Sequence, residues 1–498
     1  MNVNPITRLD YPDPDVIRVE DTYYMVSTTM HFMPGCEILQ SFDLVHWEHV
    51  TYVYETLDHT DAQQLKSGQN IYGQGMWAAS LRYHEGRFCI CFVANDTRKT
   101  YLYTSEKIDG PWKKQLIEGF YHDGSLLFDE DGRNYIVYGN DEIWITELNE
   151  DLTAPKKDGL HRLLVSDHKN PELGYEGSHI QKINGYYYIF LIHSLRDRWM
   201  RTEACFYSDS LEGEFTGGDV LCDDRGYCGQ GVAQGGIVDT PDGKWYAMLF
   251  QDSGAVGRIP ILLPVTWKDH FPFFGQNGHV PEEIEVHSTR PGYIYQPLVG
   301  SDDFCNGLLL RWQFNHDPDP RYYHLDALQG TYTITTREVC TELTQAVNTL
   351  TQRMSYPSCA AEVTVDASAL KEGDVAGLCA LQSCYAAVGI TKHHGKYEVL
   401  MLDKKEDGIL DMTEGTVVES HQMDFRLEAD FCNMKDEARC YYRVNKGDWL
   451  PIGTVHKLYF KLDHFTGCRF GLFCYAAEET GGSACFRDFK YYDVDEIS

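Results

Sequence analysis

Five segments within residues 13–250 repeat one pattern, and this repetition constrains the fold more than any other feature of the chain. In each segment an apolar run leads into a turn of Asp, Gly or Asn and continues as an aromatic run, which is the pattern of a β-hairpin. The segments are DPDVIRVEDTYYMVS, WAASLRYHEGRFCICFV, DGSLLFDEDGRNYIVYG, EGSHIQKINGYYYIFLI and QGGIVDTPDGKWYAMLF. Repetition of this kind in an all-β chain is typical of a propeller or a solenoid.

The spacing of the hairpin turns indicates how many blades there are. Successive turns lie 65, 46, 53 and 58 residues apart, for the turn residues Asp21, Gly86, Gly132, Gly185 and Gly243. Each interval is long enough for one four-stranded blade, and helical periodicity is hard to find. The sequence therefore predicts an all-β protein in which residues 1–299 form a five-bladed β-propeller.

A second domain is predicted after the propeller, because 498 residues exceed the usual size of one hydrophobic core. The blade pattern stops after HSTRPGYIYQPLVG, and short alternating strands follow at a spacing of about 10 residues, which is typical of a β-sandwich. We therefore expect residues 300–498 to form a C-terminal β-sandwich domain.

Charge and cysteine usage exclude several classes of partner. The chain has 43 Lys and Arg against 75 Asp and Glu, a formal charge of −32, which repels nucleic acid and anionic membranes. The first residues contain no signal-peptide pattern, and no stretch is long enough for a membrane span. The 16 cysteines are scattered singly through strand-like runs and are interpreted as reduced thiols. We expect a cytoplasmic protein that binds neither nucleic acid nor membrane.

Aligning the hairpins on their turns brings five positions into register. Counting back nine residues from four turns, and eight from the shorter first turn, reaches Asp13, Trp77, Asp123, Glu176 and Gln234. The first strand of each blade lines the central channel, so equivalent positions at its start converge on one axial end. Three carboxylates, one indole and one amide are therefore predicted to meet there.

Three carboxylates in one place indicate chemistry rather than packing, because like charges buried together destabilise one another. Each acid taken alone fits a surface residue at a strand end, but three in register do not. Glycoside hydrolysis uses two carboxylates, one as an acid to the leaving oxygen and the other as a base to water. Trp77 offers an apolar face on which a sugar ring can stack.

The chain resembles family 43 glycoside hydrolases, the inverting five-bladed-propeller enzymes that include β-xylosidases and α-L-arabinofuranosidases. The resemblance covers nearly the whole chain, including the second domain, and rests on YPDPDVIRVEDTYYMVSTTMHFMPG, GMWAASLRYHEGRF, HDGSLLFDEDGR, YEGSHIQKINGYYY, GRIPILLPVTW and LLLRWQFNHDPD. It implies that Asp13 is the general base, that Glu176 is the general acid, and that Asp123 tunes the pKa of the acid. It also implies that Arg258 contacts the sugar and that Phe32 lines the pocket rim.

The chain departs from the family pattern at two of the predicted positions. Trp77 is followed by Ala-Ala where the family usually has Ala-Pro, and Gln234 stands where many members have a histidine that helps to hold a central metal. The resemblance implies no cofactor for the chemistry. It allows a structural Ca²⁺ near the propeller axis, with Gln234 offering its carbonyl oxygen as a ligand. The histidines near the catalytic segments are interpreted as strand residues: His31, His122, His179 and His193.

The predicted function is an exo-acting, inverting hydrolase of small arabinoxylan- or xylan-derived oligosaccharides. It would release terminal α-L-arabinofuranose, with β-D-xylose as the close competitor, and a protein that is primarily a β-D-xylosidase is the nearest alternative. An invertase-like propeller is disfavoured, because that group carries N-D-P-N-G, R-D-P and E-C motifs where this chain has PDPDV, HDG and EGS. A non-catalytic sugar-binding propeller would require the three carboxylates to be incidental. Oligomeric state stays open.

Overall fold

The computed structural model describes residues 2–493 and confirms the all-β prediction. Within this range the chain forms strands and single 3-10 turns but no α-helix, so no helix there is long and apolar enough to cross a membrane. The 3-10 turns are η1 (Lys66–Gly68), η2 (Gly254–Val256), η3 (Leu343–Gln345) and η4 (Cys432–Met434).

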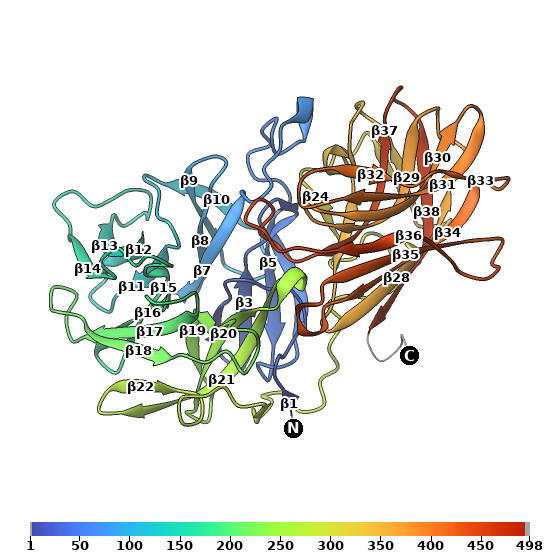
Figure 1. Ribbon diagram of the computed structural model, residues 1–498. Coiled ribbons are helices and arrows are strands. Elements are labelled where there is room, and N and C mark those ends of the chain that lie inside the picture. Colours follow the sequence, from blue (N-terminus) through green and yellow to red (C-terminus); the bar gives the residue numbers. More distant parts are fainter. Residues whose placement is uncertain (1, 494–498) are drawn as a thin grey trace.

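Five four-stranded antiparallel sheets form the propeller, as the spacing of the hairpins predicted (Figure 1). In every blade the predicted hairpin joins the first and second strands. The strands, blade by blade, are β2 (Asp15–Val19), β3 (Thr22–Ser27), β5 (Gly35–Ser41) and β6 (Glu48–Tyr54); β7 (Met76–His84), β8 (Arg87–Ala94), β9 (Lys99–Ser105) and β10 (Lys113–Ile117); β11 (Ser125–Phe128), β12 (Asn134–Asn140), β13 (Glu142–Leu148) and β14 (His161–Ser166); β15 (Glu176–Ile183), β16 (Tyr186–Ser194), β17 (Arg201–Ser208) and β18 (Thr216–Leu221); and β19 (Val232–Asp239), β20 (Trp245–Asp252), β21 (Arg258–Lys268) and β22 (Phe271–Phe274).

The second strand of each blade is buried on both faces, because each blade packs between two others. In β20 the six residues from Tyr246 to Gln251 are all buried, and in β16 the eight residues from Tyr187 to Ser194 are buried. The facing surfaces of the fourth and fifth blades share one cluster that includes Phe190, Leu249 and Ile261. The aromatic runs of the sequence are thus the cores between the blades.

The C-terminal domain is a sandwich of two sheets that share one hydrophobic core, as predicted. One sheet contains β32 (Leu410–Met412), β31 (Lys396–Lys404), β30 (Ala386–His393), β29 (Asp374–Leu381), β37 (Arg469–Ala476), β27 (Leu350–Arg353), β24 (Gln313–Asn315) and β4 (Phe32–Met33), with β33 (Thr416–Val418) also on β31. The other contains β25 (Tyr323–Asp326), β26 (Thr331–Thr335), β38 (Ser483–Asp493), β28 (Ser358–Asp366), β34 (Gln422–Asp430), β35 (Glu437–Val444) and β36 (Leu450–Lys457). The short strands β1 (Asn2–Val3) and β23 (Glu283–Ile284) pair separately.

The two domains are joined by shared structure rather than by the linker alone. Strand β4 leaves the first blade and pairs with β24, so a propeller segment is the last strand of a sandwich sheet. Arg353 in β27 donates to Glu37 at 2.6 Å and to the carbonyl of Asp10 at 2.7 Å, and its guanidinium lies over the ring of Tyr11. These groups are buried.

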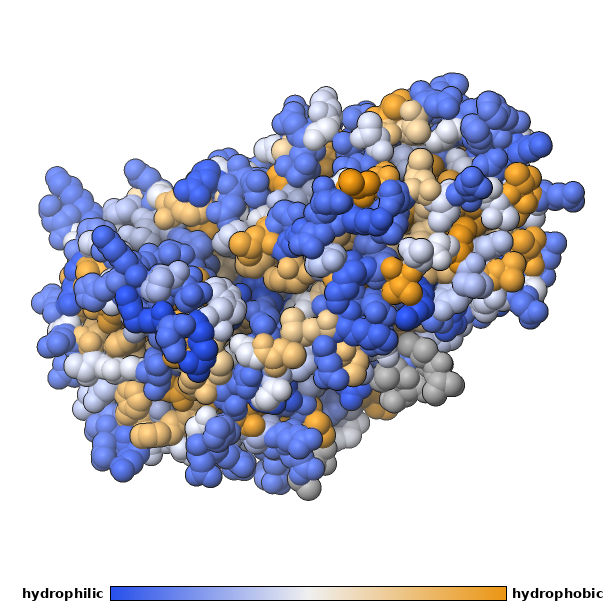
Figure 2. Space-filling view, in the orientation of Figure 1, coloured by the Kyte–Doolittle hydropathy of each residue, from blue (hydrophilic) through white to orange (hydrophobic). Residues whose placement is uncertain are grey.

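The face of the molecule seen in Figure 2 is mostly hydrophilic, with hydrophobic residues in small groups.

Candidate active site

The five predicted positions lie where the first strand of each blade begins. Asp13 and Asp123 precede β2 and β11 by two residues, Glu176 opens β15, and Trp77 and Gln234 are the second and third residues of β7 and β19. The backbone φ is positive at Asp13 (53°), Asp123 (47°) and Gln234 (59°), and β7, β15 and β19 each carry an irregularity at this point. Bulges and left-handed residues redirect side chains out of the regular pleat, which lets groups from separate blades meet.

On one side of the site, Asp13 is held by partners on both carboxylate oxygens. Its Oδ2 accepts a hydrogen bond from Thr28 Oγ1 at 2.5 Å, and its Oδ1 pairs with Arg258 Nη1 at 2.9 Å. Arg258 is buried, and its guanidinium carbon lies 5.4 Å from the ring centre of Phe250 and 4.4 Å from that of Phe465. The plane of the Asp13 carboxylate is therefore fixed.

Asp10 holds the Asp13 side of the site in place by accepting hydrogen bonds from two backbone N–H groups. Its carboxylate accepts the backbone N–H of Arg258 and that of Gly467, each at 2.7 Å. Burial raises the pKa of Asp10, although the nearby guanidinium and these N–H donors oppose that effect. A Cβ on Gly257 would lie 2.3 Å from Asp10 Oδ1, so only a glycine allows this approach. Asp10 thus ties the start of β21 and a sandwich loop to the segment that presents Asp13.

On the other side, an imidazole lies between the two remaining carboxyl groups. His122 Nε2 is 3.5 Å from Glu176 Oε2 and 3.6 Å from Asp123 Oδ2. Glu176 Oε2 also accepts a hydrogen bond from Asn140 Nδ2 at 2.7 Å, and Asp123 Oδ2 accepts the N–H of Gly177 at 3.0 Å. Glu176 and Asp123 are thereby held in one network by groups on neighbouring blades.

The protonation of this network follows from its burial and its charges. Burial raises the pKa of Asp123 to about 6, while the His122 cation lowers it and the Glu176 and Asp13 carboxylates raise it further. The Asp123 carboxylate is the main cause that raises the pKa of His122 to about 9, with Glu176 and Asp13 adding to it against the effect of burial. At neutral pH His122 therefore carries a positive charge beside the Asp123 carboxylate.

The sandwich closes one side of the site with an aromatic side chain that the sequence analysis did not identify. Phe465 lies in the loop between β36 and β37, and its ring centre is 5.5 Å from that of Trp77. Its carbonyl accepts a hydrogen bond from Arg258 Nη2 at 3.3 Å. Trp77 also meets the His122 ring edge-on at 5.8 Å. Phe465 thus bridges Trp77 on the second blade and Arg258 on the fifth.

The structure corrects the placing of Phe32, which was predicted to line the pocket rim. Its side chain is 0% exposed, and its backbone pairs with Asn315 in the sandwich sheet. The guanidinium of Arg469 lies 3.5 Å from its ring centre, and His31 packs at 4.3 Å. Phe32 therefore serves the core between the domains and presents no surface to a sugar.

Gln234, which the resemblance allows as a Ca²⁺ ligand, is held by its neighbours. Its backbone N–H donates to Glu203 at 2.7 Å, and its side chain packs against Gly177. Within residues 2–493, one group of three His, Cys, Asp or Glu side chains could hold a metal ion, and it is formed by His122, Asp123 and Glu176. A Ca²⁺ ion bound through the carbonyl oxygen of Gln234 stays a prediction.

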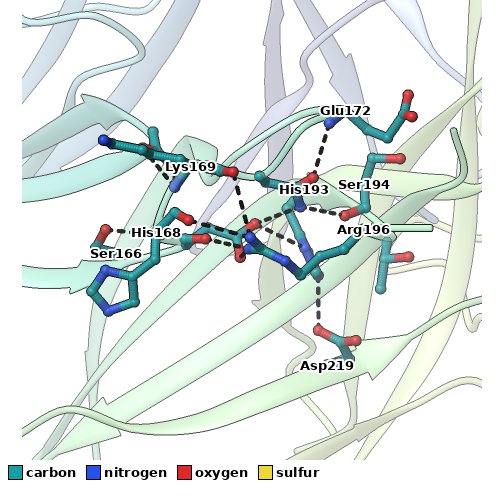
Figure 3. Close-up of polar contacts among 12 residues, drawn as sticks. Ser166, His168, Lys169, Glu172, His193, Ser194, Arg196 and Asp219 are labelled. Carbon is teal, nitrogen blue, oxygen red and sulfur yellow. Dashed lines mark hydrogen bonds and ion pairs between the residues drawn. The ribbon is translucent and has the colours of Figure 1, made fainter. Parts of the chain in front are cut away.

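A polar network fastens the loop that leads into Glu176. Figure 3 shows Arg196, from the β16–β17 hairpin, reaching across to the segment of Ser166 to Lys169. Its Nη1 donates to Asp167 Oδ1 at 3.1 Å, and its Nη2 donates to the carbonyl of His168 at 3.2 Å. His193 links this loop to β18, because its Nδ1 is 3.4 Å from Asp167 Oδ2 and its Nε2 is 2.8 Å from Asp219 Oδ1. The position of the acid-side loop is thus set by its neighbours.

Three groups in the site were missed from the sequence. His122 directly precedes a predicted carboxylate, so its register was a usable signal, but it was interpreted as a strand residue. Asn140 ends the second strand of the third blade, which places it near the start of the first strand of the next. Phe465 is 388 residues from Trp77 in sequence, and no local pattern could have joined them.

Comparisons with known proteins agree with this geometry. The family model for Glycosyl hydrolases family 43 matches residues 3–272, and that for the Beta xylosidase C-terminal Concanavalin A-like domain matches residues 301–492. A beta-xylosidase of Formosa agariphila is 26% identical over 99% of this chain and 89% of its own length. A non-reducing end alpha-L-arabinofuranosidase of Bacteroides ovatus is 24% identical over 82% of this chain and 79% of its own length.

A solved structure agrees over nearly the full length. The protein from Bacteroides eggerthii described as "Bifunctional GH43-CE" superposes with a TM-score of 0.92 at 42% identity, over 99% of this chain. This chain spans 64% of that longer chain. The resemblance inferred from the sequence motifs is confirmed for both domains, and the chain belongs to glycosyl hydrolases family 43.

Proposed function

We propose that the chain is an exo-acting, inverting glycoside hydrolase that releases terminal α-L-arabinofuranose, and also β-D-xylose, from short arabinoxylan- or xylan-derived oligosaccharides. The observation that carries the proposal is the pair of fixed carboxylates: Asp13 on the first blade with Thr28 and Arg258, and Glu176 on the fourth with Asn140 and His122. These blades are not neighbours in the ring, so a sugar can lie between the two groups.

The proposed reaction uses these groups on opposite faces of the scissile bond. Glu176 donates its proton to the glycosidic oxygen as the bond from that oxygen to the anomeric carbon breaks. Asp13 takes a proton from the water that attacks the anomeric carbon on the other face. Arg258 and Trp77 bind the sugar that is released, and Asn140 holds Glu176 toward the leaving oxygen.

The names of the relatives support both pentoses as leaving sugars. The relatives above are a beta-xylosidase and an arabinofuranosidase, and a Butyrivibrio fibrisolvens protein named Xylosidase/arabinosidase is 23% identical over 99% of this chain. A primarily xyloside-cleaving enzyme is the second candidate for this reason. Both candidates share the site and the stereochemistry.

The proposed function predicts inversion and release of monosaccharide only. Proton NMR should show that the first sugar formed from a chromogenic arabinofuranoside or xyloside has the opposite anomeric configuration to the substrate. Time courses on arabinoxylan-derived oligosaccharides should show free pentose and the shortened chain from the start. A retained anomer would overturn the role of Asp13, and early internal fragments of mixed length would overturn the exo assignment.

Two further proposals, one on metal and one on location, are tested by measuring the same hydrolytic activity. We propose that the chemistry needs no metal ion, because Asp13 and Glu176 supply both proton transfers; a chelator should leave the initial rate unchanged.

We also propose a cytoplasmic location, which the sixteen free cysteines support, since such thiols persist in reducing compartments. Activity found outside the cytosolic fraction of the source cells would contradict this proposal.

The charges around the acid predict opposite pH shifts for two variants. Asp123→Asn removes a negative charge, so the acid should lose its proton more easily and the alkaline limb of kcat/KM should move about one unit lower. His122→Asn removes a group that is positive at neutral pH because its pKa is about 9, so the limb should move about one unit higher.

The measurement is the pH profile of kcat/KM on one chromogenic glycoside, with His168→Asn as the control. His168 is an exposed histidine in the loop before Glu176, and its φ of 47° suits asparagine. Shifts of the same sign in the two variants, or an unchanged limb in both, would remove the His122–Asp123 pair from the control of the acid.

A further inference from the structure

The side of the site on which the leaving group lies can be inferred from the position of the sandwich, which covers the opposite side. The sandwich contacts the first blade through Asp10, the second through Trp77 and the fifth through Arg258. Figure 1 shows the sandwich on the side of β5 and β7, away from β13, β14, β17 and β18. The acid Glu176 lies on the fourth blade, and an acid protonates the oxygen of the leaving group. The rest of the oligosaccharide therefore extends over the third and fourth blades.

An exposed tryptophan lies on this uncovered side. Trp199 is in the hairpin between β16 and β17, and its residue is 43% exposed. All eight other tryptophans lie within the described residues and are buried or only partly exposed. Hairpins between second and third strands lie at the same end of the propeller as the start of the first strand, which in this blade is Glu176. Trp199 is thus on the same end as the acid.

A series of contacts between guanidinium groups and aromatic rings joins Trp199 to Arg258 in the site. The guanidinium of Arg201 lies over the Trp199 ring, 5.5 Å from its centre, and 5.1 Å from the ring centre of Phe250. Phe250 is contacted by Arg258 at 5.4 Å. Arg201 is also held by Asp252 at 3.1 Å. The indole is thereby supported by a fixed cation, while the residue as a whole stays 43% exposed.

Hydrogen bonds hold the hairpin that carries Trp199 in a fixed position. Met200 N–H donates to Ser194 Oγ at 2.7 Å, and Leu195 N–H donates to the carbonyl of Met200 at 3.1 Å. Arg196 fastens the hairpin to the loop of Asp167, as Figure 3 shows. A rigid aromatic surface binds with little loss of conformational entropy.

We propose that Trp199 is the stacking platform for a distal sugar of the leaving group, so that the site includes a subsite for the second neutral pentose beyond the cleaved bond. The proposal rests on the proposed function. An indole packs against the apolar C–H face of a sugar ring, and Trp199 offers that surface where the leaving chain must pass. The subsite would favour oligosaccharides over disaccharides and aryl glycosides.

The test compares Trp199→Ala with Phe273→Ala across substrate length. Phe273 is a matched control, because it is an aromatic residue with 50% exposure on the outermost strand of the fifth blade. Trp199→Ala should raise KM about tenfold for oligosaccharides with two or more sugars beyond the cleaved bond, without a change in kcat. Disaccharides and nitrophenyl glycosides should be unaffected, and Trp199→Phe should restore most of the affinity.

The outcomes separate this subsite from the proposed function. Equal losses on nitrophenyl glycosides and long oligosaccharides would mean that Trp199 acts through the fold of the site, and would overturn the subsite. An unchanged KM at every length would also overturn it. If the unaltered protein hydrolyses no xylo-oligosaccharide and no arabinofuranosyl-xylo-oligosaccharide, the proposed function fails instead.

Discussion

Glu176→Gln should nearly abolish hydrolysis of natural oligosaccharides, with a loss of about 10²- to 10⁴-fold in kcat. The change removes the proton donor but keeps the shape of the side chain. The glutamine carbonyl can still accept the hydrogen bond that Asn140 Nδ2 donates to Glu176, so the loop should keep its position. On nitrophenyl glycosides the loss should be much smaller, because that leaving group departs with little protonation.

The measurement is the ratio of rates on the two substrate types for the variant and the unaltered protein. Glu172→Gln is the matched control, because Glu172 is an exposed glutamate in the same loop. It should leave both rates unchanged. Equal losses on oligosaccharide and nitrophenyl glycoside in Glu176→Gln would contradict the acid role, and unchanged activity on both would show that another group protonates the leaving oxygen.

The register of the site could be predicted from the sequence because a propeller repeats one local structure. Turns such as Gly132 and Gly185 mark the same point in each blade, so counting back nine residues reached Asp123 and Glu176 without any knowledge of contacts. The bulges and positive φ angles that turn these side chains out of the pleat could not be predicted from the sequence. They do not disturb the count, because they occur where the first strand of each blade begins, which is where the counted positions themselves lie.

The missed and misplaced residues depend on pairings between distant segments. The family resemblance implies that Phe32 lines the pocket rim, but β4 pairs with β24 of the sandwich and takes Phe32 into the core. Phe465 enters the site for the converse reason, through a loop of the second domain. His122 can be seen in the sequence, but its charge cannot, because the carboxylates that raise its pKa, Asp123 foremost, surround it only in the folded propeller.

The backbone at Asp13 makes glycine the suitable replacement for testing the base. Asp13 has a φ of 53°, a conformation that glycine adopts without strain and that costs alanine about 1 kcal/mol. Asp13→Gly removes the carboxylate that Arg258 and Thr28 hold. Hydrolysis should fall by about 10²- to 10⁴-fold, because no group remains to take the proton from the attacking water.

Added azide should restore part of the rate of Asp13→Gly on a nitrophenyl glycoside, because azide needs no base. It can enter the space left by the carboxylate, next to the Arg258 cation, and form a bond to the anomeric carbon as the nitrophenolate leaves. Attack from the side of Asp13 requires a glycosyl azide of inverted configuration, which NMR of the product identifies. Asp158→Gly is the control, since Asp158 is exposed and also has a positive φ, 59°. A retained glycosyl azide would place the entering group on the wrong face. A folded variant that azide does not rescue would make Asp13 a sugar-binding residue rather than the base.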